Sequence, residues 1–149
     1  MTDRTVLATV KAHGRRVGQA EVAERPMTLL PFAARDGVVS PFSANGNPFV
    51  APIWRDCTPA RLALSVYCPT NDGANYWSIT LYIIGPAGFA FSQGSVTTSA
   101  LAAGQWLPLA LTTFVTARWV ASAFSVAYLS IAKVGAPGTI EIAPALYVL

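Results

Sequence analysis

Residues able to carry out acid–base or nucleophilic chemistry are few in this chain. Its one histidine, His13, lies between Ala12 and Gly14, far from any obvious partner. Asp56 and Asp72 stand in turn contexts, where a carboxylate is expected to accept hydrogen bonds from nearby backbone. No carboxylate pair, glycine-rich phosphate loop or nucleophile elbow is indicated by the spacing. The sequence therefore predicts a protein that is not an enzyme.

Metal-ligating residues are equally sparse. Cys57 and Cys68 are the only cysteines, and no histidine cluster accompanies them. The first ten residues lack the apolar core of a secretory signal, so we expect free, buried thiols in a reducing cytoplasm, with pairing only in an oxidising compartment. The polar run 71–75 offers oxygen atoms, but a β-turn explains its composition without an ion. We expect no metal site and no cofactor.

Aromatic residues are the main candidates for binding. Tyr76 and Tyr82 occupy outward positions of one alternating segment, Tyr67 occupies an outward position of its expected neighbour, and Trp54 lies in a nearby loop. Because sugar faces stack on exposed rings, these four are the candidate glycan-binding residues. The alternative, which the scarcity of charge favours, is that they pack under the N-terminal segment or in a subunit contact. Core or interface packing is expected for Trp77, Trp106 and Trp119.

The elements that must position these rings are β-strands. In 61–68 and 76–84 every second residue is apolar, which is the period of a strand with one buried face. Turns rich in Gly, Pro, Asn and Asp follow at short intervals and exclude long helices. In 124–134 the alternation slips near Tyr128 and Leu129, which predicts a β-bulge. About eight strands at regular spacing are typical of a sandwich or barrel.

Residues 73–117 carry no formal charge, which raises the question of whether this stretch spans a membrane. A spanning helix needs about 20 consecutive apolar residues, and this stretch is interrupted by residues such as Gln105 and Pro108. Alternate leucines at 107, 109 and 111 have the period of a strand instead. We therefore expect no membrane insertion and infer that other protein covers much of this apolar surface.

Charge divides the chain into two parts. Charged residues make up 11% of the sequence, against an average of about 25%. Ten of them lie in residues 1–36, which we interpret as an extended N-terminal arm, and seven lie in residues 37–149, the β-sandwich domain. So few charges predict a homo-oligomer, with a trimer as the first expectation. The small basic cluster at 11–16 precedes Glu21 and Glu24, so no nucleic acid partner is expected.

Three segments resemble a known architecture. They are WSITLYIIGPAG, ALAAGQWLPLALTTF and FSVAYLSIAKVGAPGTIEIAPALYVL, at 77–88, 100–114 and 124–149. Together they resemble jelly-roll sandwiches of carbohydrate-binding-module type, over about residues 60–149. Bacteriophage tail, fibre and head-decoration proteins often contain this pattern. Such modules often carry an acidic residue in the closing strand and a calcium site beside it. Glu141 lies in that strand here, but Ile142, Ala143 and Pro144 occupy the usual aspartate positions, so we expect no calcium site.

The resemblance implies an all-β fold, an antiparallel jelly-roll β-sandwich with an extended N-terminal arm. It also implies a function, that of a non-enzymatic bacteriophage virion structural protein of capsid decoration, cement or fibre type. Its sandwich would contact other copies, its arm would contact other virion proteins, and it would be assembled into the virion in the host cytoplasm. The alternative is a glycan-binding module that recognises a host surface polysaccharide.

Overall fold

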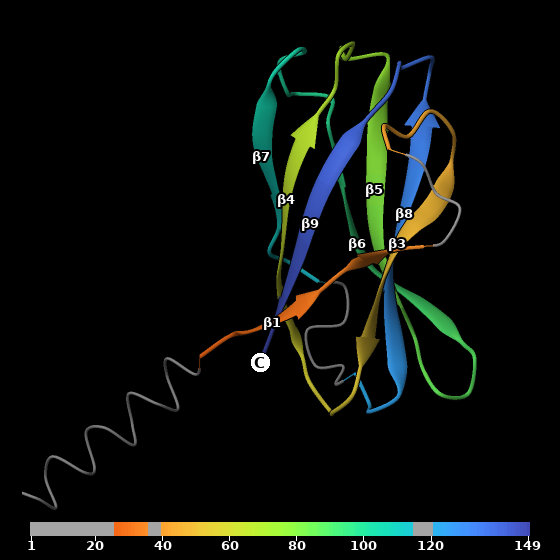
Figure 1. Ribbon diagram of the computed structural model, residues 1–149, viewed down its shortest axis with the longest axis vertical. Coiled ribbons are helices and arrows are strands. Elements are labelled where there is room, and N and C mark those ends of the chain that lie inside the picture. Colours follow the sequence, from red (N-terminus) through yellow and green to blue (C-terminus); the bar gives the residue numbers. More distant parts are fainter. Residues whose placement is uncertain (1–25, 36–39, 115–120) are drawn as a thin grey trace, which may run out of the picture.

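The computed structural model describes residues 26–35, 40–114 and 121–149, and within these ranges the chain contains strands and turns without a helix. Nine strands form two antiparallel sheets packed face to face (Figure 1). The all-β sandwich predicted from the sequence is therefore confirmed. Residues 1–25, most of the predicted arm, lie outside the described residues.

Each sheet draws its strands from both halves of the described chain. Sheet A contains, in spatial order, β1 (Thr28–Pro31), β9 (Glu141–Val148), β4 (Pro59–Tyr67) and β7 (Trp106–Leu111). Sheet B contains, in spatial order, β2 (Ala33–Ala34), β3 (Gly46–Ile53), β8 (Ser125–Val134), β5 (Tyr76–Ile84) and β6 (Ala90–Thr97). Late strands thus lie between early ones in both sheets, β9 between β1 and β4 and β8 between β3 and β5. This interleaving of two sheets is the jelly-roll arrangement.

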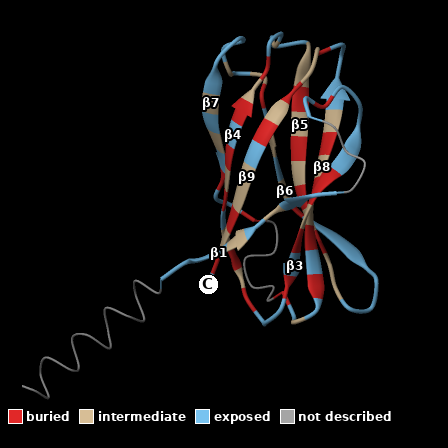
Figure 2. Ribbon diagram, in the orientation of Figure 1, coloured by how far each residue is buried: buried red, intermediate tan, exposed pale blue. Residues whose placement is uncertain are grey.

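The core lies between the sheets and is built by the two-residue period of the strands. Along β5 the side chains of Trp77, Ile79, Leu81 and Ile83 are fully buried, and the residues between them are partly exposed. Strand β4 follows the same pattern in sheet A, with Leu62 buried opposite this row. Alternating buried and less buried bands follow the strands in Figure 2. Burial of these apolar side chains stabilises the fold by about 25 cal/mol for each Å² removed from water.

The described part of the predicted arm belongs to the sandwich. Strand β1 pairs with the last strand, so that Thr28 lies opposite Val148, and β2 pairs with β3, so that Ala33 lies opposite Val50. Residues 28–34 therefore add one strand to each sheet instead of extending away from the body. The sequence did not reveal this pairing, because β1 pairs with the last strand of the chain and β2 has only two residues, too few to show an alternation.

The irregularity predicted near Tyr128 and Leu129 is present in the pairing of β8 with β3, but not in its pairing with β5. Strand β8 pairs with β5 without a register shift, and Tyr128 lies opposite Tyr82 while Leu129 lies opposite Leu81. On its other side β8 does have an irregular pairing, because Leu129 lies opposite Phe49 and Ile131 opposite Gly46, which places the extra residue on β3. A second register shift, between β5 and β6, lies beside Gly94, whose φ of 151° suits a glycine in a distorted strand. The alternation looked as if it slipped because the outward positions Val126 and Tyr128 are also apolar or aromatic, while Leu129 beside them faces the core.

The loops gather at two ends of the sandwich, which we name for their side chains. The polar end contains the connections 68–75, 98–105 and 135–140, at the top of Figure 1. The aromatic end contains the connections 54–58 and 85–89 and the residues 121–124 that precede β8, toward the bottom of the same view. Pro26 and Leu149 lie near the aromatic end, close to Arg55.

Candidate interaction surfaces

Side-chain hydrogen bonds lock the loops of the polar end together. The Asn71 amide nitrogen donates to the carbonyl oxygens of Thr98 and Leu101, at 2.6 and 2.9 Å. The hydroxyl of Thr98, a fully buried residue, donates to the Asn71 amide oxygen at 2.7 Å. This hydroxyl also accepts a bond of 3.0 Å from the Trp77 backbone amide. Two neighbouring loops are therefore fixed to each other and to β5.

The acidic turn at the polar end satisfies its own carboxylate. Asp72 Oδ1 accepts hydrogen bonds from the backbone amides of Ala74 and Asn75, at 2.8 and 2.7 Å, and the Asn75 side chain donates to both carboxylate oxygens. The Asn75 side-chain bond, followed by these backbone bonds, holds the pKa of Asp72 below its ordinary value. Among the described residues, no three His, Cys, Asp or Glu side chains gather as a metal site would require. The turn is explained by its hydrogen bonds.

The two cysteines lie at different ends and are both free and buried. Cys57 pairs with Ala121 at the aromatic end, whereas the Cys68 carbonyl accepts a bond from the Gly104 amide at the polar end. Burial is the main cause that raises the pKa of each thiol. Both thiols are therefore protonated and poorly reactive at neutral pH.

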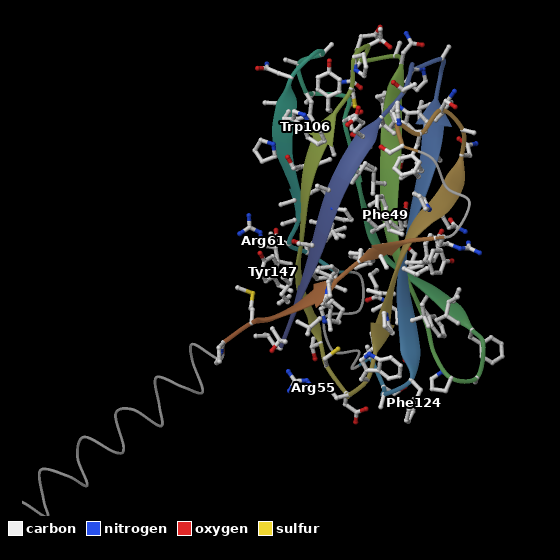
Figure 3. All side chains as sticks on the ribbon, viewed as in Figure 1. Phe49, Arg55, Arg61, Trp106, Phe124 and Tyr147 are labelled. Carbon is white, nitrogen blue, oxygen red and sulfur yellow. The ribbon has the colours of Figure 1, made fainter. Side chains whose placement is uncertain are left out.

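Large aromatic side chains project from the aromatic end. Trp54 is 71% exposed, Phe89 69% and Phe124 74%. They follow β3, precede β6 and precede β8, so all three project from the same end of sheet B. Figure 3 shows Phe124 and Arg55 at this end of the sandwich. Single exposed apolar residues scattered over a surface are normal, but several large ones at the same end of a domain are typical of an interaction surface.

The outer face of sheet A is nearly uncharged. By strand register, its outward residues are Leu29, Pro31, Arg61, Ala63, Ser65, Tyr67, Trp106, Pro108, Ala110, Glu141, Ala143, Ala145 and Tyr147. The middle of this face carries small side chains, and Tyr67 and Trp106 contact each other near one end with ring centroids 5.8 Å apart. Arg61 and Glu141 lie toward opposite ends, because Arg61 is opposite Tyr147 and Glu141 is opposite Tyr67.

The outer face of sheet B carries a stacked pair of tyrosines. Tyr82 and Tyr128 have ring centroids 5.1 Å apart and planes inclined by 6°. Beside them lies an open cavity of about 330 Å³, lined by Arg35, Asn47, Val50, Ile84, Val126 and Tyr128. Its lining combines an apolar floor with one guanidinium and one amide, which is the composition of many small-molecule sites.

The four candidate glycan residues lie on three different surfaces. Tyr76 and Tyr82 share the outer face of sheet B but stand toward opposite ends of β5. Tyr67 lies on the outer face of sheet A, and Trp54 lies at the aromatic end. The structure therefore brings Tyr82 together with Tyr128, which sequence reasoning missed. Outward alternation of both residues would have been the signal.

The tryptophans expected in the core or in contacts differ from one another. Trp77 is fully buried in the core, and its prediction is confirmed. Trp106 is 51% exposed on sheet A, where it contributes to the apolar outer face. Trp119 lies outside the described residues. No helix among the described residues is long and apolar enough to cross a membrane.

Comparisons with known proteins give a fold likeness alone. No family model matches the chain, and no curated protein matches it. Among solved structures it is similar to the VP2 subviral particle of infectious bursal disease virus, with a TM-score of 0.49, 14% identity, and coverage of 83% of this chain and 30% of that one. The structure of the Gt strain of this virus gives a TM-score of 0.44 at 14% identity, covering 83% and 32%. The chain spans about a third of the length of these proteins, and with TM-scores of 0.49 and 0.44 nothing about function follows from the likeness.

Proposed function

We propose that this protein is a non-enzymatic structural protein of a virion, which assembles with copies of itself and with other virion proteins. The fold and the outer face of sheet A support the proposal. The jelly-roll sandwich recurs in viral capsid domains, although it also serves lectins and other proteins. Because a fold does not fix a function, the surface of the sandwich carries the argument.

The observation that carries the proposal is the outer face of sheet A. Among its described residues, only Arg61 and Glu141 are charged, and they lie at opposite ends of the face. Most monomers keep their surfaces apart with many interspersed charges. A broad face of small apolar side chains instead suits close packing against a second sheet, at about 10 Å between the sheets. Contact between copies would bury this face.

The finer assignment within the virion follows from the sequence resemblance. We infer a bacteriophage decoration, cement or fibre protein, whose residues 1–25 contact other virion proteins. Pro26, the first described residue after them, lies next to the connection that contains Arg55. The assembled protein would be found in the virion, with assembly in the host cytoplasm.

Mass in solution tests the assembly. The full chain should sediment as an oligomer, and Ala143→Asp should shift it to smaller species because each copy then places a charge in the apolar face. Ser92→Asp is the matched control, since Ser92 is exposed on sheet B. A chain that begins at Pro26 retains β1 and tests whether residues 1–25 are needed for attachment to particles. A full chain that stays monomeric at every concentration would contradict the proposal.

A second candidate function is recognition of a glycan on sheet B. The observation that favours it is the Tyr82–Tyr128 stack beside a cavity lined by Arg35 and Asn47. An aromatic face with adjacent polar groups can orient a sugar ring. Glycan-array binding that disappears in Tyr82→Ala and Tyr128→Ala, but persists in Tyr67→Ala on the other sheet, would support it. Absence of binding by the unmodified chain would contradict it.

A further inference from the structure

The backbone of the aromatic end holds one of its aromatic residues in an unfavourable conformation. Phe124 has a φ of 68°, and it is the one non-glycine residue with positive φ in the part of the chain that the structure describes. Bulky side chains rarely adopt this left-handed region, and such strain occurs most often at functional sites. Phe124 is also 74% exposed, so burial in the sandwich does not compensate for the strain. The fold therefore displays this ring at a cost to its own stability.

Hydrogen bonds fix the position from which Phe124 projects. Its backbone amide donates to the Ile53 carbonyl at 2.7 Å, directly beside Trp54. The preceding amide, of Ala123, donates to Asp56 Oδ1 at 2.8 Å. These bonds tie the end of β3 to the start of β8. Trp54 and Phe124 consequently project from two adjoining segments that hydrogen bonds from backbone amides hold together, and we refer to these two residues as the aromatic pair.

The two charged residues next to this pair have opposite signs, so the same patch on a second copy can match them. Arg55 and Asp56 are consecutive, and Arg55 is placed by a hydrogen bond of 2.9 Å to the Thr28 hydroxyl. A two-fold axis through this end would bring Arg55 of each copy toward Asp56 of the other. Two-fold contacts use the same patch on both copies and require this kind of self-complementarity. Aromatic residues and arginine are also the residues most enriched in the energetic centres of protein interfaces.

A lipid surface fits the aromatic end less well. Segments that bind anionic membranes surround their apolar residues with several lysines or arginines. In the connection 54–58 the single basic residue, Arg55, is followed directly by the acidic Asp56. The net charge of this connection is therefore zero, which gives no attraction to an anionic bilayer.

We propose that the aromatic end is a two-fold contact between two copies of this chain, in which Trp54 of each copy packs against Phe124 of the other. A buried aromatic side chain covers about 150 to 250 Å², so these two rings offer about 300 Å² on each copy. Phe89 and Leu149, both exposed nearby, extend the apolar area toward the roughly 800 Å² per copy of a typical specific interface. This contact is separate from the packing of sheet A proposed above.

Sedimentation equilibrium of the full chain over a concentration series tests the contact. Trp54→Ala and Phe124→Asn should each weaken association about 30-fold, the effect expected for residues at an interface centre. Trp106→Ala, which removes an exposed tryptophan from sheet A, should leave this association step unchanged. Circular dichroism and thermal melting confirm that each variant retains the sandwich.

A charge exchange makes the test specific for a two-fold axis. Arg55→Asp alone and Asp56→Arg alone should each place like charges opposite each other and prevent association. A mixture of the two variants should restore it as a heterodimer, because every pair across the axis then has opposite charges. Oligomers that are insensitive to Trp54→Ala and Phe124→Asn would overturn the contact and leave the proposed assembly through sheet A intact.

Two further outcomes would also overturn the contact. A monomeric full chain would overturn it together with the proposed assembly. Monomers that sediment with phosphatidylserine vesicles and lose this binding in Trp54→Ala would assign the aromatic end to a lipid surface.

Discussion

The two ends of the sandwich differ in how their loops are stabilised and in what they expose to solvent. At the polar end, loops are joined by side-chain hydrogen bonds such as those of Asn71, and the buried Thr98 has partners for its hydroxyl. At the aromatic end, the hydrogen bonds hold the backbone, while Trp54 and Phe124 extend into solvent. One end joins its loops through side-chain hydrogen bonds, and the other leaves large apolar side chains exposed. The contrast indicates that the polar end maintains the fold, whereas the aromatic end is where we propose the contact with a second copy.

The difference in packing between the ends is clearest at two glycines. Gly135 and Gly88 both have positive φ, at 69° and 84°. A Cβ on Gly135 would collide with the Ala74 carbonyl oxygen and the Asn75 side chain, whereas one on Gly88 meets nothing within 4 Å. Gly135→Ala should therefore reduce the free energy of unfolding by about 3 kcal/mol or more, and Gly88→Ala by about 1 kcal/mol. Urea unfolding of both variants measures the difference. Equal losses of stability would show that the two ends have equal room for an added side chain.

Removal of the Asn71 side chain should have the next largest effect. Asn71→Ala leaves the Thr98 hydroxyl without its Asn71 acceptor and the Leu101 carbonyl without its Asn71 donor, whereas the Thr98 carbonyl keeps its bond from the Leu101 amide. We expect a loss of about 2 to 3 kcal/mol in the free energy of unfolding. Asp56→Ala removes one hydrogen bond, to Ala123, from the aromatic end and should cost about 1 kcal/mol. If Asp56→Ala proved the more damaging change, the polar end would not be the more strongly determined part of the fold.

Local pattern was sufficient to predict the strands and their buried faces. The alternation along β5 correctly places Trp77 and Ile79 inward and Tyr76 outward, because burial of one face depends on the two-residue period. The turn at Asp72 was predictable for the same reason, since its hydrogen bonds join residues two and three positions apart. Strand faces and tight turns can be predicted in this way because they depend on residues only a few positions apart.

The candidate surfaces depended on long-range pairing and could not be predicted in this way. The connections that carry Trp54 and Phe124 come together because β3 pairs with β8, so that Ile53 lies opposite Ser125. Likewise, Tyr82 finds Tyr128 only through the register of β5 and β8. A residue's period shows which face of its strand it occupies, but not which other residues share that face.

The strain at Phe124 gives a prediction in the opposite direction from the first two. Asparagine adopts left-handed φ more readily than phenylalanine, and no buried packing is lost because the ring is exposed. Phe124→Asn should therefore increase the free energy of unfolding by about 1 kcal/mol. Phe89→Asn is the control, because Phe89 is similarly exposed and its φ is not positive, and it should change stability by less than about 0.5 kcal/mol. A destabilised Phe124→Asn monomer, measured at a concentration too low for association, would mean that the ring supports the fold of its own copy.

The smallest expected effect is a pH dependence at the polar end. Hydrogen bonds to the Asp72 carboxylate lower its pKa in the folded chain, so the stability they contribute is fully present above the ordinary aspartate pKa. That contribution is lost as the pH falls through the lower, folded value, because the protonated acid no longer accepts the same charge-assisted bonds from Asn75 and the backbone. Urea unfolding of the unmodified chain and of Asp72→Asn should therefore give midpoints that differ at neutral pH and converge in acid. A difference that stays constant as the pH falls would mean that the charge of Asp72 does not stabilise the turn, and that the polar end relies on neutral hydrogen bonds such as those of Asn71.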